Sequence, residues 1–400
     1  MNLFKKIYCR TYQTIFRMIL PILPYREPVL LNSNDDIINV LKQHNKTSVL
    51  LVTDRAIRNL QLTQSLENTI IANSLKLTVY DGTVPNPTTD NVAAALQLYH
   101  DNQCDCIIAF GGGSAMDCAK ATGARVVRPK KSLAKMKGIL KVGKKIPLLI
   151  AIPTTAGTGS ETTLASVITD STTRHKYAIN DFPLIPSYAA LMPELTLGLP
   201  PHITATTGMD ALTHAVEAYI GRSTTKQTRT YAERAVKDIF ENLLTAYQDG
   251  NNLTARTKML HAAYYAGVAF TQSYVGYVHA VAHSLGGKYN IPHGLANAVI
   301  LPYVLRKFGR KIYKKLWRLG VAANLFDRST SYEVGAKLFI QTIDDMNSAM
   351  GIGTSIPEIQ DADIAELAKT AEHEANPLYP VPVLWTTKEL IQIYEEVKNG

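Results

Sequence analysis

One carboxylate and four histidines stand at helical spacing within apolar stretches of the second half of the sequence. Asp210 and His214 are four residues apart, as are His279 and His283, and His293 follows in an Ile-Pro-His-Gly segment. Residues four apart lie on the same face of a helix. A lone histidine in such a setting is usually a core residue, but this grouping favours ligation of a divalent metal. The ligand types suit Zn²⁺ or Fe²⁺ and do not choose between them.

Two glycine-rich segments in the first half could hold phosphate groups. The segment 111–117 (GGGSAMD) follows an apolar strand pattern and opens a helix, whose backbone N–H groups and dipole favour an anion. A tight turn between strand and helix is the alternative, and the pattern is not the G-x-G-x-x-G of a Rossmann fold. The segment 153–161 (PTTAGTGSE) also follows a strand. Two such loops in one sheet predict a dinucleotide bound across them.

Asp54 closes the first predicted strand, where a carboxylate could bind the diol of the adenosine ribose. A carboxylate at that position repels a 2′-phosphate, so NAD is favoured over NADP. The same residue could instead cap a helix.

These residues must be positioned by two kinds of architecture. Up to about residue 200, short apolar strands alternate with helical stretches, which predicts a parallel sheet covered on both faces. We expect strands at 48–53, 75–80, 106–110 and 147–152, and helices at 56–72, 89–102 and 115–124. Beyond Pro201 the strand signal fades, and helices are expected at 205–220, 231–248, 253–272, 294–304 and 331–350. The sequence therefore predicts a basic amphipathic extension, an α/β dinucleotide-binding domain and an all-helical metal-binding domain at 1–27, 28–200 and 201–400.

The formal charge of +9 comes from a few places in the chain. Half of the 42 Lys and Arg residues fall in 1–27, 125–145 and 306–318. The stretch 125–145 is expected to be a solvated loop, and 306–318 a surface helix with an inward apolar stripe. None of the three overlaps the glycine-rich loops or the metal set, and none carries aromatic residues spaced for base stacking, so we expect no nucleic-acid partner.

The N-terminal 27 residues combine five basic side chains with interspersed apolar ones. Arg17 and Pro21 interrupt the apolar run and no small-residue cleavage site follows, which disfavours a signal peptide. The pattern predicts an amphipathic helix lying on the protein, on a neighbouring subunit or on a membrane surface. No apolar run is long enough to predict a spanning helix.

The four cysteines match no zinc ribbon and no disulfide framework. We expect them to be reduced and the protein to be cytoplasmic. They are Cys9, Cys104, Cys106 and Cys118.

Several motifs in a fixed order resemble the iron-containing (group III) alcohol dehydrogenases. They are the segments 81–88, 111–117, 153–161, 199–215 and 278–294, and the resemblance spans roughly residues 28–397. It implies an α/β fold in which an N-terminal dinucleotide-binding parallel-sheet domain is followed by an all-helical C-terminal domain. It also implies an active site in the cleft, as in dehydroquinate synthase-like folds.

Carried over residue by residue, the resemblance implies one metal site, one catalytic histidine and one cofactor set. The metal ligands are Asp210, His214, His279 and His293, with Fe²⁺ favoured and Zn²⁺ as the alternative. His283 is implied to be the additional active-site histidine, near the nicotinamide and the substrate. The implied cofactor-binding residues are Asp54, Asn86, Gly112, Gly113, Ser114, Asp117, Thr154, Thr155, Thr158 and Lys176.

Two segments depart from the family pattern. Residues 1–27 lie outside its core, and 374–382 replaces a stretch that often carries a cysteine. The second departure bears on substrate identity more than on the chemistry.

The predicted function is that of a metal-dependent alcohol dehydrogenase. It would transfer a hydride between a small alcohol, or its aldehyde or ketone, and NAD(H), with the metal as Lewis acid on the substrate oxygen. One alternative is an NAD- and metal-dependent lyase or synthase of the dehydroquinate synthase type, which returns its cofactor unchanged. Another is a non-catalytic basic binding protein. The resemblance also implies a homo-oligomer, and a peripheral membrane contact through residues 1–27 stays open.

Overall fold

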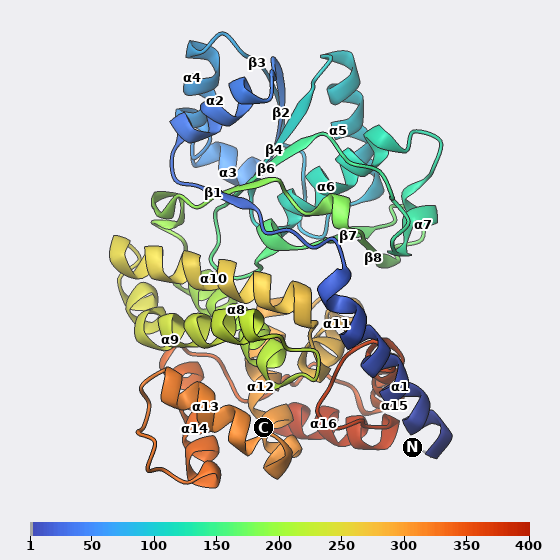
Figure 1. Ribbon diagram of the computed structural model, residues 1–400, viewed down its shortest axis with the longest axis vertical. Helices are drawn as coiled ribbons and strands as arrows, with labels where there is room; N and C mark the ends of the chain where they lie inside the picture. The colour runs from blue at the N-terminus through green and yellow to red at the C-terminus, as the bar shows by residue number, and fades with distance from the viewer. Residues whose placement is uncertain (1–2) are drawn as a thin grey trace. The chain divides into compact units, whose positions relative to one another are not determined.

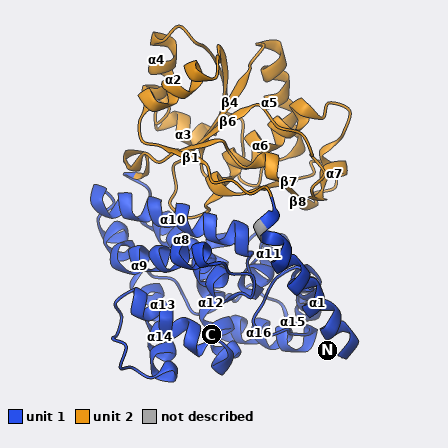
Figure 2. Cartoon of the chain, in the orientation of Figure 1, with its two compact units in different colours: residues 1–23, 197–400 blue, residues 24–196 orange. Residues whose placement is uncertain are grey.

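The computed structural model describes residues 3–400, which form two compact units (Figures 1 and 2). One unit is Pro24–Thr196, and the other joins Leu197–Gly400 to the N-terminal segment that ends at Leu23. The first two residues of the expected N-terminal extension lie outside the described residues. Among the described residues, no helix is both long and apolar enough to cross a membrane.

The first unit is built on a six-stranded, fully parallel sheet. Its strands lie in the order β1, β9, β6, β4, β2, β3. They span Val29–Leu31, Tyr188–Ala190, Leu148–Pro153, Cys106–Gly111, Ser48–Val52 and Lys76–Tyr80. The four strands expected from the sequence are confirmed, and they lie side by side from β6 to β3. Strands β1 and β9 were not predicted, because each is only three residues long.

Helices cover both faces of this sheet, as its continuous apolar strands require. On β2, Val49 and Leu51 pack against one set of helices and Leu50 and Val52 against the other, because side chains alternate along a strand. The covering helices are α2 (Asn34–Gln43) and α4 (Gln64–Ala72) on one face, and α5 (Thr89–Asp101) and α6 (Gly113–Val127) on the other (Figure 1).

The prediction of one continuous helix over residues 56–72 is wrong. This segment is divided into α3 (Arg55–Asn59) and α4, with Gln61 between them in the left-handed region at φ 57°. That conformation ends a helix, since it is unfavourable for a residue with a Cβ and is used in turns. A three-stranded sheet of β5 (Gly138–Ile139), β8 (Lys176–Asn180) and β7 (Ala165–Thr169) was also not predicted.

In the described residues of the second unit, all regular secondary structure is helical. Its helices are α1 (Leu3–Ile19), α8 (Pro201–Ile220), α9 (Lys226–Gln248), α10 (Leu253–Ser273), α11 (Tyr277–Tyr289), α12 (His293–Phe308), α13 (Tyr313–Ala322), α14 (Tyr332–Ala349), α15 (Asp361–Ala375) and α16 (Thr387–Asn399). The five helices expected between 205 and 350 are confirmed. α8 is buried on nearly all sides, which makes it the central helix of the unit.

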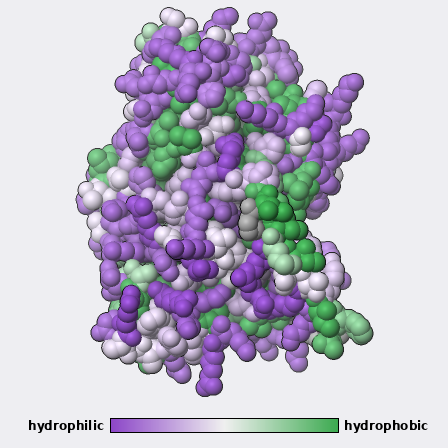
Figure 3. Space-filling model, viewed as in Figure 1, coloured by the Kyte–Doolittle hydropathy of each residue, from purple (hydrophilic) through white to green (hydrophobic). Residues whose placement is uncertain are grey.

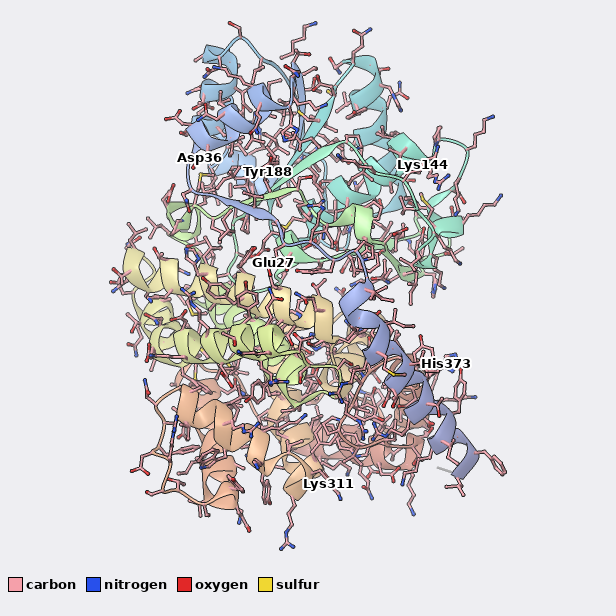
Figure 4. All side chains as sticks on the ribbon, viewed as in Figure 1. Glu27, Asp36, Lys144, Tyr188, Lys311 and His373 are labelled. Carbon is pink, nitrogen blue, oxygen red and sulfur yellow. The ribbon has the colours of Figure 1, made fainter. Side chains whose placement is uncertain are left out.

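The expected continuous helix over 306–318 is wrong. α12 ends at Phe308, Gly309 adopts φ +53°, and a short 3₁₀ turn η5 (Gly309–Lys311) precedes α13. Phe308, Ile312 and Leu316 are nevertheless buried, so the inward apolar stripe is confirmed. The lysines labelled in Figure 4, Lys144 and Lys311, are exposed at the surfaces of their respective units.

Candidate active site

The residues with metal-ligand chemistry come from three helices of the second unit. Asp210 and His214 lie one turn apart on α8, His279 lies on α11, and His293 begins α12. One ligand atom from each side chain lies within 4.8 Å of the corresponding atoms of the others. His293 is partly exposed and the other three are buried. The structure therefore brings together the four side chains that the sequence analysis singled out.

Glu217, one turn beyond His214 on α8, orients His279. Glu217 Oε2 lies 2.6 Å from His279 Nδ1 and accepts a hydrogen bond from the Gly276 N–H at 2.7 Å. Gly276 is required here, because a Cβ would lie 2.6 Å from Glu217 Oε1. Burial and the neighbouring imidazoles hold the pKa of His279 well below its usual value, so the ring is neutral. With Nδ1 donating to Glu217, Nε2 is left as the metal-binding atom.

The amide of Asn297, one turn after His293 on α12, lies among the ligand atoms of the cluster. Its amide Nδ2 lies 2.7 Å from Asp210 Oδ1, 3.1 Å from His293 Nε2 and 3.3 Å from His279 Nε2. The two hydrogens of one amide thus face three acceptors. A divalent cation satisfies such a set, and one carboxylate with three imidazoles suits Fe²⁺ or Zn²⁺. The residues present therefore fit a metal.

Replacing Glu217 with Gln is expected to weaken metal affinity by about 10–100-fold, the usual effect of losing the partner of a metal-bound histidine. Both oxygens of Glu217 are acceptors, Oε2 from His279 and Gly276 and Oε1 from the Val278 N–H at 2.8 Å. The amide keeps the volume but turns an N–H₂ donor toward one of these donor groups. Competition with a chelator measures the change, and Glu241→Gln, an exposed carboxylate on α9, is the matched control. Equal affinity in Glu217→Gln and the control would show that Glu217 does not orient the ligand.

His283 lies beside the cluster and has a carboxylate partner of its own. Its ring stacks on that of His293 with centroids 5.1 Å apart, and its Nδ1 lies 2.6 Å from Glu374 Oε1. The Tyr379 hydroxyl donates to the same oxygen at 2.6 Å. Burial would raise the pKa of Glu374, but His283 and these two hydrogen bonds outweigh it and lower the pKa. Glu374 is therefore an ionised partner that orients the His283 ring through Nδ1 and leaves Nε2 outside that contact.

In the first unit, the two glycine-rich loops leave adjacent strands at the same edge of the sheet. Gly111 at the end of β4 is in register with Pro153 at the end of β6. Gly111 has φ +147°, and a Cβ there would lie 2.9 Å from Ala115 Cβ, so the turn into α6 requires glycine. The N-terminus of α6 opens beside the second loop. Proposed cofactor residues on these two loops and α6 are Gly112, Gly113, Ser114, Asp117, Thr154, Thr155 and Thr158.

The remaining proposed cofactor residues lie near the same edge. The Asn86 backbone N–H donates to Ser114 Oγ at 3.3 Å, and Lys176 Nζ donates to Asn86 Oδ1 at 2.7 Å. Asp54 follows β2 and caps α3, accepting a hydrogen bond from the Ile57 N–H at 2.9 Å. The cap that the sequence left open as an alternative is therefore present, and it uses Oδ1 only.

Lys120, which the sequence analysis did not single out, fastens the second loop to α6. Its buried ammonium donates to the backbone oxygens of Ser160, Thr163 and Ala165 at 2.7–3.0 Å and to the hydroxyls of Ser160 and Thr163. Burial lowers the pKa of Lys120 to about 8, against the opposing charges of Asp117 and Glu161. A lysine in an apolar helix, three residues from Asp117, was the signal that could have identified it.

Three further site residues were not identified from the sequence, and residue spacing could have indicated two of them. Glu217 shares the helix face of Asp210 and His214 at positions i, i+4 and i+7, and Asn297 stands at i+4 from His293, so spacing could have found both. Glu374 meets His283 from 91 residues away, and no local pattern indicates that contact.

Comparisons with known proteins agree over both units. Residues 31–193 match the family described as "Iron-containing alcohol dehydrogenase", and residues 204–397 match "Fe-containing alcohol dehydrogenase family, C-terminal". Alcohol dehydrogenase 4 of Saccharomyces cerevisiae is 36% identical over 358 residues, covering 89% of this chain and 92% of the yeast protein. The NAD-dependent methanol dehydrogenase of Bacillus methanolicus is 34% identical over 336 residues, covering 83% and 87% of the two chains.

A solved structure shows the same fold. The crystal structure of a 1,3-propanediol oxidoreductase superposes with a TM-score of 0.89 at 32% identity, covering 93% of this chain and 99% of that one. With both units matched and relatives above 30% identity over most of their length, this chain belongs to the iron-containing alcohol dehydrogenase family.

Proposed function

We propose that the protein is a metal- and NAD-dependent alcohol dehydrogenase that transfers a hydride between a short-chain alcohol, or its aldehyde or ketone, and the nicotinamide. The observation that carries the proposal is the convergence of Asp210, His214, His279 and His293 within 4.8 Å. The glycine-rich loops of the first unit support a dinucleotide. The name of the Bacillus methanolicus relative supports NAD.

The metal held by these four side chains would supply a Lewis acid for the substrate oxygen. Glu217 orients His279 through Nδ1, and Asn297 donates a hydrogen bond to Asp210 Oδ1. We assign His283 Nε2 as the acceptor of the hydrogen bond from the substrate hydroxyl, with Glu374 and Tyr379 orienting the ring. Fe²⁺ is the proposed ion because of the family, and Zn²⁺ is the alternative because the same ligands suit it. Elemental analysis of freshly purified protein distinguishes the two.

Nicotinamide absorbance during incubation with alcohols tests the function. Metal-analysed enzyme is incubated with NAD⁺ or NADP⁺ and with methanol, ethanol, 1-propanol or 1,3-propanediol, and in reverse with NADH and the aldehydes. Net NADH formation that depends on the metal supports the proposal. An enzyme that binds metal and NAD but gives no net redox change with any of these substrates would instead favour the synthase or lyase alternative.

Replacing Asp54 with Asn is expected to raise the kcat/KM ratio of NADP⁺ over NAD⁺ by about tenfold, because a negative charge facing the 2′-phosphate is removed. The amide oxygen can still cap α3, so the fold is preserved. Steady-state kinetics with both cofactors measures the ratio. Asp36→Asn, at the start of α2 in the same unit, controls for a general change of charge, and an unchanged ratio in Asp54→Asn argues against ribose recognition by this residue.

We further propose that the enzyme is a cytoplasmic homo-oligomer. The described cysteines, all buried and free, support a reducing compartment, and the family resemblance supports self-assembly. Light scattering of the purified protein and fractionation of the source cells test these two statements.

A further inference from the structure

The N-terminal helix α1 turns its apolar side outward. Phe4 is 84% exposed and Met18 66% exposed, and Ile22 of the following turn η1 (Leu20–Ile22) is 79% exposed. At spacings of three and four residues these side chains form one stripe along the helix. The exposed residues of this outward stripe are Phe4, Ile7, Tyr8, Ile15, Met18 and Ile22. Figure 3 shows hydrophobic surface over both ends of α1.

The opposite side of α1 faces the protein with both apolar and polar contacts. Cys9 is buried, and the Phe16 ring meets that of Tyr274 edge-on with centroids 5.0 Å apart. Arg10 donates to the backbone oxygens of Val381 and Pro382 at 2.8 and 3.0 Å, and buried Gln13 donates to that of Tyr379 at 2.7 Å. Lys5 forms an ion pair with Glu372 on α15. A surface helix ordinarily packs its apolar side inward. Most of the large apolar side chains of α1 are nevertheless exposed, and such hydrophobic surfaces mark interaction sites.

Positive charge gathers along one flank of the stripe. Lys315 Nζ donates to the backbone oxygens of Ile220 and Gly221 at 2.7 Å, immediately before Arg222 in the chain. The Arg222 N–H donates to Pro380 O at 2.7 Å, next to Val381, whose oxygen Arg10 of α1 binds. Arg17, Arg222 and Arg318 are exposed. The basic flank consists of these three exposed arginines; Lys315 and Arg229 are half-buried, and Arg229 donates to Thr224. An acidic neighbour, Glu233, accepts a hydrogen bond from Tyr219.

We propose that α1 docks on the surface of an anionic lipid bilayer, with the outward stripe at the level of the headgroups and acyl chains and the basic flank over the lipid phosphates. Aromatic and aliphatic side chains on one helix face with Lys and Arg beside them are what interfacial helices use. A second copy of the chain is a poorer occupant, because a two-fold contact through α1 would bring the same cations of both copies together.

Vesicle flotation tests the proposal on the full-length, metal-loaded enzyme. We expect wild-type protein to bind phosphatidylglycerol-containing vesicles at least tenfold more strongly than pure phosphatidylcholine vesicles, and added salt to weaken the binding. The triple variant Phe4→Ser, Ile15→Ser, Met18→Ser is expected to lose binding by roughly tenfold or more. Its alcohol oxidation should be unchanged, since these side chains face away from the unit.

A matched variant shows whether loss of binding is specific to α1. Leu253→Ser, Val334→Ser, Leu338→Ser removes three other exposed apolar side chains, from α10 and α14 of the same unit, and should bind vesicles like wild type. Equal binding to both kinds of vesicle, or equal binding by the two triple variants, would overturn the proposal. So would an absence of vesicle binding together with an oligomer that the α1 variant dissociates, which would assign the stripe to a sister subunit.

Discussion

Replacing His279 with Ala is expected to remove the bound metal and to lower kcat/KM for alcohol oxidation by about 10³-fold or more. The imidazole is one of four ligands from three helices, and its loss leaves a three-ligand set with the buried carboxylate of Glu217 facing a void. Lewis-acid stabilisation of the developing charge is worth several kcal/mol, and each 1.36 kcal/mol is about tenfold in rate. Metal content by elemental analysis and steady-state kinetics on the same sample measure both effects.

His100→Ala is the matched control for this variant. His100 is an exposed histidine on α5 of the other unit, so its removal should leave both metal content and rate unchanged. A metal-free His279→Ala enzyme with full activity would refute the proposed role of the metal. Full metal content with lost activity would instead remove His279 from the ligand set.

Replacing Lys120 with Met is expected to destabilise the α/β unit by about 3–5 kcal/mol, the usual effect of removing one partner from a buried charge group. The carbonyl and hydroxyl oxygens of Ser160 and Thr163 lose their donor. Asp117 and Glu161, whose pKa values burial raises to about 7, lose their neighbouring cation. Urea unfolding followed by circular dichroism measures the free energy change.

The pH dependence of the Lys120→Met variant distinguishes this explanation from a packing defect. Without the ammonium, the folded-state pKa values of Asp117 and Glu161 rise further above those of the unfolded chain. A carboxyl that is harder to ionise when folded contributes stability at low pH and loses it as the pH rises. The deficit of the variant should therefore grow as the pH rises through 7. A deficit independent of pH, or one shared by Lys130→Met at an exposed site, would contradict the charge argument.

The sequence predicted the architecture where periodicity is strong and the contacts are local. Strands β2, β4 and β6 are continuous apolar runs, and the histidines of α11 stand one turn apart. The sequence pattern alone therefore predicted these strands and the shared helix face of the histidines. The break at Gly309 is less visible, because the apolar stripe continues on the far side of it. The contact of Glu374 with His283 depends on the packing of α15 against α11, which no local pattern encodes.

For α1, the sequence pattern predicted an amphipathic helix but left open which surface its apolar face covers. Amphipathicity predicted a helix, and ordinary burial would place its apolar face inward. The irregular segment after α15 presents backbone oxygens that need donors, and Arg10 and Gln13 supply them. Satisfying those carbonyls decides which side of α1 faces the unit.

The hydrogen bonds of α1 also fix an order of events during synthesis. Arg10 and Gln13 bind residues more than 360 positions later in the chain, whereas the unit Pro24–Thr196 is continuous. The α/β unit can therefore fold as it leaves the ribosome, because domains generally fold as units and in order of emergence. Helix α1 cannot dock until residues 379–382, which supply its docking surface, have been translated. During that interval it is an undocked basic amphipathic segment of the nascent chain, accessible to chaperones and lipid surfaces.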